Sequence, residues 1–208
     1  GEMTYKLTGE LGYRFAAVAS ITGLINENSA KTCKPVRPFP IIHMHGTSDT
    51  YETWNGDNKN LWTVPQTVNF WIEKNGCSLP GDTVSLPDIN PGDRCTVEKI
   101  SYTNCSGSGC FIFYKINKGG HHWPDASFNW GGGYLNRDIN ANVEILNFFK
   151  NHILDTSAQY VNIPDPEFLN YLIKKGVDTN GDGLVNYPEL VGILSLRFID
   201  IDGADCLN

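Results

Sequence analysis

The sequence predicts an α/β fold, in which helices cover both faces of a mostly parallel sheet. Short apolar runs that end at glycine alternate along the chain with segments of helical spacing. Polar loops follow the strand-like runs, as is typical of strand–loop–helix units. The chain has 208 residues, 40% hydrophobic and 19% charged, which favours one main domain with a small appendage.

Hydrophobic spacing predicts each element in turn. Apolar side chains three or four residues apart indicate helices, whereas continuous or alternating apolar runs indicate strands. The predicted elements, in chain order, are an opening helix bearing Met3, Leu7 and Leu11 on one face, strands at 15–23 and 40–46, a helix at 64–75, strands at 95–102 and 111–116, and a helix at 139–153. In the last helix we expect four apolar residues to face inward: Val143, Leu146, Phe149 and Ile153.

Charge and hydropathy argue against two classes of partner. The formal net charge is −7, and no basic run exceeds the pair Lys174–Lys175, so a nucleic-acid-binding surface is not expected. The longest apolar stretches, such as 15–24, are interrupted well short of the ~20 residues that a membrane-spanning helix needs. We therefore expect a soluble protein without a membrane span.

Six cysteines lack the C-x-x-C spacing of a zinc or redox site: Cys33, Cys77, Cys95, Cys105, Cys110 and Cys206. Disulfides in an oxidising compartment are the favoured interpretation, which predicts a secreted or periplasmic protein. No signal-peptide pattern precedes the opening helix at Gly1. We expect either that processing removed the original start or that the sequence is a fragment.

Four motifs stand in a specific order and spacing. They are His-Gly-Thr-Ser-Asp at 45–49, Val-Pro-Gln-Thr-Val-Asn-Phe-Trp-Ile-Glu-Lys-Asn-Gly-Cys at 64–77, Gly-Gly-His-His-Trp-Pro at 119–124 and Asn-Arg-Asp-Ile-Asn-Ala at 136–141. Together they resemble the polyhydroxybutyrate depolymerase and feruloyl esterase family of α/β-hydrolases, over about three quarters of the chain. The resemblance implies an α/β-hydrolase fold, of which this chain would hold the C-terminal half.

The resemblance also implies two catalytic residues, Asp49 as the acid and His121 as the base of a Ser-Asp-His triad. An imidazole accepts a serine proton only if its other nitrogen donates to a group that fixes the tautomer, and a loop carboxylate serves this purpose. Both residues follow predicted strands, where ligand sites of such sheets lie. Asp49 could instead be only a turn-former. His122 is the adjacent alternative base, and the motif favours His121.

The nucleophile is expected upstream, in a G-x-S-x-G elbow whose last glycine would be Gly1. The oxyanion hole would also draw on earlier residues, so the chain as written should not hydrolyse esters by itself. The family resemblance further implies a disulfide between Cys77 and Cys105. Partners for the other four cysteines stay open.

Five further side chains have two interpretations each. His43 and His45 face the same side of a strand and could hold a metal, but no third ligand is evident and structural roles are favoured. Trp54, Trp123 and Trp130 could stack on a sugar or an aromatic acyl group, or they could simply pack the loops.

The C-terminal part predicts a structural calcium site of the EF-hand type. Residues 178–189 fill the pattern D-x-[DN]-x-[DN]-G-x₅-E, flanked by helical spacing at 167–175 and 188–198. The oxygen ligands of Ca²⁺ would come from Asp178, Asn180, Asp182, the carbonyl of Leu184, Asn186 and Glu189. The alternative is a surface turn that never binds calcium.

The expected organisation has three parts. Residues 1–157 form a partial esterase domain without its nucleophile elbow, and residues 158–198 form the calcium-binding module. The module resembles the EF-hand-like segments that precede leucine-rich repeats in secreted bacterial proteins. Residues 199–208 would then begin a truncated repeat.

Two function classes follow. The first is a secreted carboxylic ester hydrolase that needs no cofactor for catalysis. Its relatives act on plant cell-wall polysaccharide esters, such as feruloylated or acetylated xylan, or on polyhydroxyalkanoate. The second is a non-catalytic, calcium-dependent binding or scaffold protein on a similar fold.

Overall fold

A computed structural model describes residues 1–35, 37–57, 60–129, 132–154, 161, 163–179, 181, 183–186 and 189–190. The chain divides into two compact units, Gly1–Leu154 and Asp155–Asn208, and each is described by itself. Among the described residues no helix is long and apolar enough to cross a membrane.

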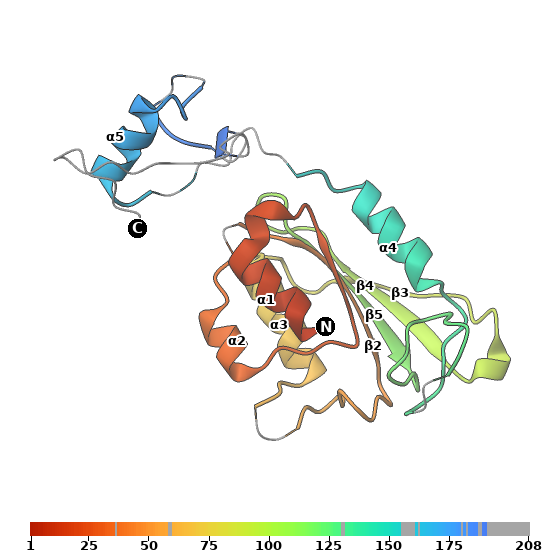
Figure 1. The fold of residues 1–208 in the computed structure, drawn as a ribbon. Coiled ribbons are helices and arrows are strands. Elements are labelled where there is room, and N and C mark those ends of the chain that lie inside the picture. Colours follow the sequence, from red (N-terminus) through yellow and green to blue (C-terminus); the bar gives the residue numbers. More distant parts are fainter. Residues whose placement is uncertain are drawn as a thin grey trace. The chain divides into compact units, whose positions relative to one another are not determined.

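The first unit is built on a mixed sheet of five strands (Figure 1). The strands are β1 (Val18–Ile21), β2 (Pro40–Gly46), β3 (Asp82–Ser85), β4 (Thr96–Tyr102) and β5 (Cys110–Asn117), in the spatial order β1-β2-β5-β4-β3. β1, β2 and β5 are parallel, whereas β3 and β4 add antiparallel neighbours. The sheet is compatible with the predicted α/β class. It is less parallel than expected, because the short turn between β4 and β5 cannot make a parallel crossover.

Helices lie on both faces of this sheet. α1 (Glu2–Leu11), α2 (Glu27–Thr32) and α3 (Val64–Lys74) lie on one side, and α4 (Ala141–Lys150) lies on the other (Figure 1). Short 3₁₀ turns occur at Gly12–Arg14 and Pro91–Asp93. Side-chain caps fix the helix starts: Asn26 for α2, Thr63 with Gln66 for α3, and Asn140 for α4.

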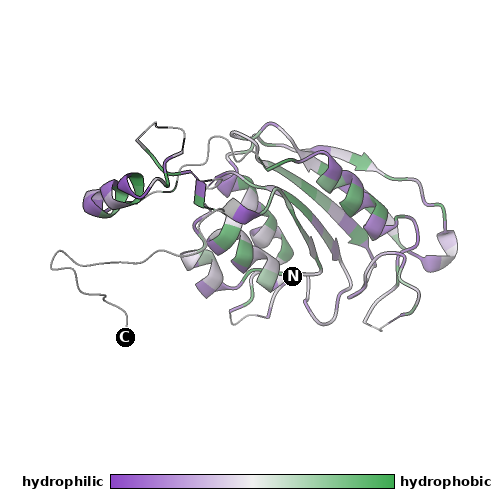
Figure 2. Ribbon diagram, turned by 45° about the horizontal axis from the view of Figure 1, so that its top comes forward, coloured by the Kyte–Doolittle hydropathy of each residue, from purple (hydrophilic) through white to green (hydrophobic). Residues whose placement is uncertain are grey.

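Alternating residues of β2 supply two separate cores. Ile41 packs in a cluster with Tyr5 of α1 and Trp71 of α3. Its neighbour Ile42 points the other way and packs in a cluster with Phe148 of α4. Figure 2 shows hydrophobic residues along the central strands and on the helices beside them. The period-two alternation of a strand thus places helices against both faces, as predicted.

The inward face of α4 was predicted wrongly. The buried residues of this helix are Ala141, Ile145 and Phe148. The four residues expected inside are exposed: Val143 by 51%, Leu146 by 57%, Phe149 by 38%, and Ile153, beyond the helix, by 90%. Both sets have helical spacing, so the periodicity alone did not distinguish them. The helix starts two residues later than predicted, at the Asn140 cap, and Ala141, Ile145 and Phe148 pack against the sheet.

The fully buried residues of the opening helix are not those of the predicted apolar face, of which Leu7 and Leu11 are half-buried. Met3 is exposed by 63%, whereas Tyr5 and Thr8 are fully buried. Tyr5 is buried because its hydroxyl has a hydrogen-bond partner inside the fold, His43. Two elements went unpredicted, α2 and β3, and all four residues of β3 are exposed, so no buried alternation marks that strand.

Cys77 and Cys105 form a disulfide, the pairing that the family resemblance implies. Cys33, Cys95 and Cys110 are free thiols, and Cys206 lies outside the described residues. Burial raises the pKa of Cys33 and Cys110 to about 11 and that of Cys95 to about 12. The broader expectation of disulfides is therefore met by one pair in the described part of the chain.

The second unit contains α5 (Pro166–Lys174), which Asp165 caps through the backbone amides of Glu167 and Phe168. A small core of Leu172, Val177 and Val185 joins this helix to the loop that follows it. Of the second predicted helix, at 188–198, only residues 189–190 are described, and the predicted repeat at 199–208 lies outside the described residues.

Candidate active site

The candidate site lies where three neighbouring parallel strands end. Thr22 follows β1, Asp49 lies in the loop after β2, and His121 lies in the loop after β5. Because parallel strands end at the same edge of a sheet, residues far apart in sequence come together there. The register pairs Gly46 with Ile116, so the loops after β2 and β5 start side by side.

Asp49 and His121 form a hydrogen-bonded pair. Oδ2 of Asp49 lies 2.9 Å from Nδ1 of His121. The other oxygen, Oδ1, accepts hydrogen bonds from the backbone amides of Tyr51 at 2.9 Å and Glu52 at 3.0 Å. Asp49 is only 4% exposed. An acceptor at Nδ1 fixes the imidazole as the tautomer whose Nε2 lone pair is available to take a proton.

Backbone contacts between glycines set the separation of the two loops. A Cβ at Gly46 would lie 2.2 Å from the carbonyl oxygen of Gly119. The amide of Ser48 donates to the same oxygen at 2.9 Å, and that of Thr47 donates to the carbonyl of Ile116 at 2.9 Å. The Asp49 loop and the His121 loop therefore meet main chain to main chain.

Two further histidines, His43 and His45, are buried on β2, the strand that leads to Asp49. The rings of His43 and His45 stack with centroids 5.5 Å apart. Nδ1 of His43 bonds the hydroxyl of Tyr5 at 2.6 Å, and Nε2 of His45 donates to the carbonyl of Glu52 at 2.8 Å. Among the described residues, no group of three or more His, Cys, Asp or Glu side chains could hold a metal ion.

Burial keeps these two histidines neutral. It holds the pKa of His43 well below the usual range and lowers that of His45. Nε2 of His45 lies 3.7 Å from Oδ2 of Asp49, farther than Nδ1 of His121. A neutral His45 whose Nε2 proton is bonded to a carbonyl does not compete for a hydrogen bond to the Asp49 carboxylate. Oδ2 of Asp49 therefore pairs with His121.

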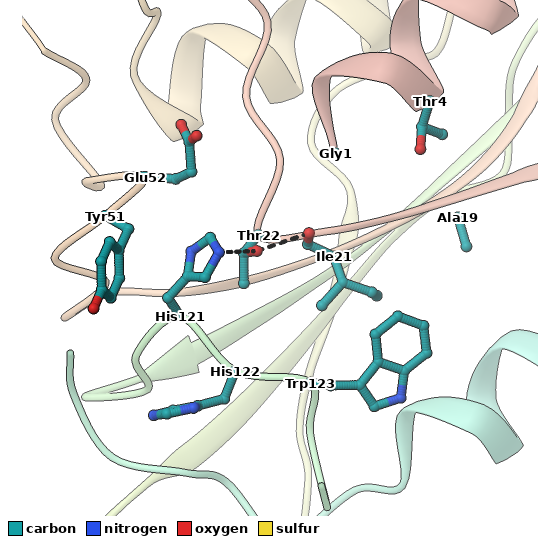
Figure 3. A pocket seen from close by; sticks show the side chains of 10 residues that line it. All are labelled: Gly1, Thr4, Ala19, Ile21, Thr22, Tyr51, Glu52, His121, His122 and Trp123. Carbon is teal, nitrogen blue, oxygen red and sulfur yellow. Dashed lines mark hydrogen bonds between the residues drawn. The ribbon is translucent and has the colours of Figure 1, made fainter. Parts of the chain in front are cut away.

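A cavity of about 690 Å³ opens beside His121 (Figure 3). Its lining combines apolar, aromatic and polar groups from all three strand ends and from α1: Gly1, Thr4, Ala19, Ile21, Thr22, Tyr51, Glu52, His121, His122 and Trp123. The Tyr51 ring meets the His121 ring edge-on, with centroids 5.3 Å apart. A concave, largely apolar pocket with a few convergent polar groups is typical of a small-molecule site.

Thr22 is a residue of the site that the sequence did not single out. Its hydroxyl donates to the carbonyl of Ile21 at 2.8 Å and lies 3.4 Å from Nε2 of His121 (Figure 3). Its φ is +52°, a conformation that a β-branched residue rarely adopts. Strained backbone of this kind gathers at functional sites. The available signal was its position, at the end of a predicted strand and directly before Gly23.

The histidine and tryptophans that the sequence analysis also considered lie partly in the cavity wall and partly in the core. His122 is buried and turns its Nε2 to the carbonyl of Gly133 at 3.3 Å. Trp54 packs against the core rings of His45 and Phe113, whereas Trp123 lines the cavity. Trp130 lies outside the described residues.

Part of the predicted calcium loop can be placed. The Asp178 carboxylate accepts from the amides of Gly181 at 2.7 Å and Gly183 at 2.9 Å. The Glu189 carboxylate accepts from the amides of Thr179 and Asn186, each at 2.9 Å. Two of the predicted ligands, Asn180 and Asp182, lie outside the described residues, whereas Leu184 is described.

Comparison with known proteins finds a partial likeness to an esterase. The chain is 33% identical over 106 residues to feruloyl esterase B of Piromyces equi. The match covers 47% of this chain and 18% of the esterase, so the chain spans less than a fifth of that relative's length. No family model matches the chain.

Proposed function

We propose that this chain carries the acid and base of a secreted serine carboxylic ester hydrolase, with Asp49 orienting His121. The observation that supports this most is the 2.9 Å contact between the buried carboxylate and Nδ1 of His121, with Nε2 turned to the cavity side. The partial likeness to a feruloyl esterase supports the same reaction class.

In the proposed reaction His121 accepts the proton of a serine hydroxyl as the serine attacks the ester carbonyl. His121 then gives that proton to the leaving alcohol, while Asp49 stabilises the imidazolium. A water molecule attacks the acyl-enzyme in a second cycle of the same proton transfers. We assign the serine to a strand-to-helix elbow that leads into α1. The position of Gly1 in the cavity lining, at the start of α1, supports this assignment.

The lining of the cavity is the basis for a proposal about the substrate. The cavity has aromatic walls at Tyr51 and Trp123, and such walls suit a cinnamoyl-type acyl group or a sugar ring. We propose esters of plant cell-wall polysaccharides, such as feruloylated or acetylated xylan, ahead of polyhydroxyalkanoate. The Cys77–Cys105 disulfide supports an extracellular or periplasmic location.

The test is hydrolysis of p-nitrophenyl acetate and methyl ferulate by the full-length protein and by His121→Ala and Asp49→Asn variants. We expect kcat to fall by roughly 10³-fold or more in each variant, because the pair acts as a unit. His152→Ala, which removes an imidazole that does not line this cavity, is the matched control. Near-parental rates in either site variant would exclude that residue as the acid or base.

A second proposal concerns calcium. We infer that residues 178–189 bind Ca²⁺ to stabilise the second unit. The carboxylates of Asp178 and Glu189 are both held by backbone amides of this one loop, which suits an oxygen-rich site. The amide of Val161 also donates to the carbonyl of Val185 at 2.7 Å and fixes the middle of the loop.

Thermal unfolding with and without about 10 mM CaCl₂ tests the calcium proposal. With a dissociation constant of ~10⁻⁴–10⁻³ M, bound calcium would add about 1.4–2.7 kcal/mol to the unfolding free energy of the unit. Glu189→Gln should abolish this gain, whereas the control Glu167→Gln, on α5, should keep it. An equal gain in all three proteins would show non-specific ion effects. That outcome would favour a turn that never binds calcium.

A non-catalytic binding or scaffold protein is the competing proposal for the chain as a whole. It predicts that the full-length protein binds calcium but hydrolyses none of these esters. The hydrolysis assay and the calcium titration together separate the two classes.

A further inference from the structure

His45 lies next to the proposed acid but is not part of the triad. It is the penultimate residue of β2, and its side chain is fully buried. Its ring stacks on that of His43 with centroids 5.5 Å apart, and it meets the Trp54 ring edge-on at 6.3 Å. Contacts on two sides fix the plane of the imidazole, so the direction in which Nε2 points is fixed as well.

Nε2 of His45 bonds the turn that holds the Asp49 carboxylate. It donates to the carbonyl of Glu52 at 2.8 Å. The amide of Glu52 donates to Oδ1 of Asp49 at 3.0 Å, next to the amide of Tyr51 at 2.9 Å. Glu52 is thus held through its carbonyl on one side and through its amide on the other. The bond from His45 therefore acts on the position of Asp49 through the main chain of Glu52.

The charge state of His45 suits this task. Burial lowers its pKa, His121 acts in the same direction, and the Glu52 carbonyl and the Asp49 carboxylate act in the opposite one. Nδ1 of His45 is buried and makes no hydrogen bond with any residue that the structure describes, which agrees with a proton on Nε2. A protonated His45 would compete with His121 for Oδ2 of Asp49, 3.7 Å from Nε2. The neutral ring holds the turn without that competition.

We propose that His45 is a positioning residue, whose bond to the Glu52 carbonyl keeps the Asp49 carboxylate aligned with Nδ1 of His121. This inference rests on the proposed ester hydrolysis. It adds a residue that touches neither the substrate nor the reacting atoms and acts through the turn at Asp49. Without that bond the Glu52 carbonyl loses its donor and the turn can shift. A displacement of about 1 Å in a catalytic group can lower the rate by about 10²-fold.

The experiment compares substitutions of His45 in the full-length protein. His45→Gln places an amide nitrogen as many bonds from Cβ as Nε2 is, so it can still donate to Glu52. His45→Asn holds the same amide nearer the main chain and falls short of that carbonyl, whereas His45→Leu fills the space without a donor. Val68→Ala, which removes buried packing on α3, is the matched control for general destabilisation. The measured quantities are kcat, KM and the pH profile of kcat/KM for p-nitrophenyl acetate and methyl ferulate.

We expect kcat to fall by roughly tenfold or more in His45→Leu and His45→Asn, with KM changed less than kcat, and His45→Gln to recover most of the loss. The pH profile should change as well. When Asp49 is less well aligned, the imidazolium of His121 loses stabilisation, so the acid limb of kcat/KM should move to lower pH by roughly half a pH unit. Val68→Ala should keep the parental kcat and acid limb, because a loss of stability alone does not alter the folded site.

A parental kcat and an unmoved acid limb in His45→Leu and His45→Asn would overturn the inference. Equal losses in His45→Gln and His45→Asn would also overturn it, because the shape of the ring and not its donor would then matter. Failure of the underlying function gives a different result: the parent would hydrolyse neither ester, or His121→Ala would hydrolyse both at the parental rate, and the role of His45 would fall with it. Thermal unfolding checks that each variant folds. If His45→Leu does not fold, the comparison of His45→Gln with His45→Asn still decides.

Discussion

The hydroxyl of Tyr5 lies 2.6 Å from Nδ1 of His43, and both side chains are fully buried. This bond joins α1 to the centre of β2, two residues before His45 on the strand that leads to Asp49. The same helix begins at the cavity with Gly1. The contact therefore holds α1 against the strand that leads to the candidate acid.

Removing this hydroxyl is expected to destabilise the fold. Tyr5→Phe leaves Nδ1 of His43 buried without a partner, which should cost about 1–3 kcal/mol of unfolding free energy. Denaturant unfolding measures the change. Tyr102→Phe, which removes the hydroxyl of a half-buried tyrosine on β4, is the control and should cost less. Equal losses would mean that the Tyr5–His43 bond contributes nothing specific.

Stability should depend on pH through the buried histidines. The pKa of His43 and that of His45 are lowered in the folded state, so below about pH 6.5 the unfolded chain binds protons that the folded chain does not. The unfolding free energy should therefore fall as pH drops below about 6.5, by at most ~1.4 kcal/mol per pH unit for each histidine, and level off above it.

Denaturant melts between pH 5 and 8 measure this dependence. His43→Gln should flatten the slope, whereas His152→Gln, on the segment after α4, should not. A parental protein whose stability rises on acidification in this range would contradict the burial argument.

The close contact between Gly46 and Gly119 predicts that position 46 tolerates no side chain larger than that of glycine. Gly46→Ala places a Cβ against the carbonyl of Gly119, and main chain on both sides leaves little room to adjust. We expect a loss of at least about 2–3 kcal/mol of stability together with most ester hydrolysis. Gly92→Ala, where the nearest atom within reach is Oδ1 of Asn90 at 3.3 Å, is the control. Parental stability and activity in Gly46→Ala would show that the loops can separate without consequence.

The disulfide predicts a separate stability effect. Cys77 and Cys105 are 28 residues apart, and closing a loop of that length stabilises by about 3–4 kcal/mol in the chain-entropy description. In denaturant melts, the unfolding free energy of the double variant Cys77→Ala/Cys105→Ala should be lower than that of the parent by that amount. A reducing agent should shift the parent but leave the double variant unchanged. A shift in both would show that the reducing agent acts on something other than the Cys77–Cys105 bond.

The sequence predicted the proximity of Asp49 and His121 better than the packing around them. Asp49 and His121 could be placed at one edge of the sheet because polar loops follow two strongly apolar runs, and the structure brings the two side chains together. The buried face of α4 could not be predicted, because this helix has apolar residues on more than one side and contacts with the sheet decide which side is buried.

The contribution of Thr22 was also beyond the sequence. It belongs to no motif, and it reaches the cavity because it follows β1, the neighbour of β2 in the sheet. Its positive φ and the position of its hydroxyl, 3.4 Å from Nε2 of His121, set it apart. Both properties are three-dimensional, and residue type does not encode them.

The strained backbone at Thr22 has a consequence for engineering this protein. A residue in such a conformation costs of order 1–3 kcal/mol, and glycine would relieve much of that cost. A library selected for heat resistance alone would therefore enrich Thr22→Gly and discard the hydroxyl 3.4 Å from His121. Directed evolution of a more thermostable variant should therefore alternate two selections, one for stability on heating and one for catalytic turnover.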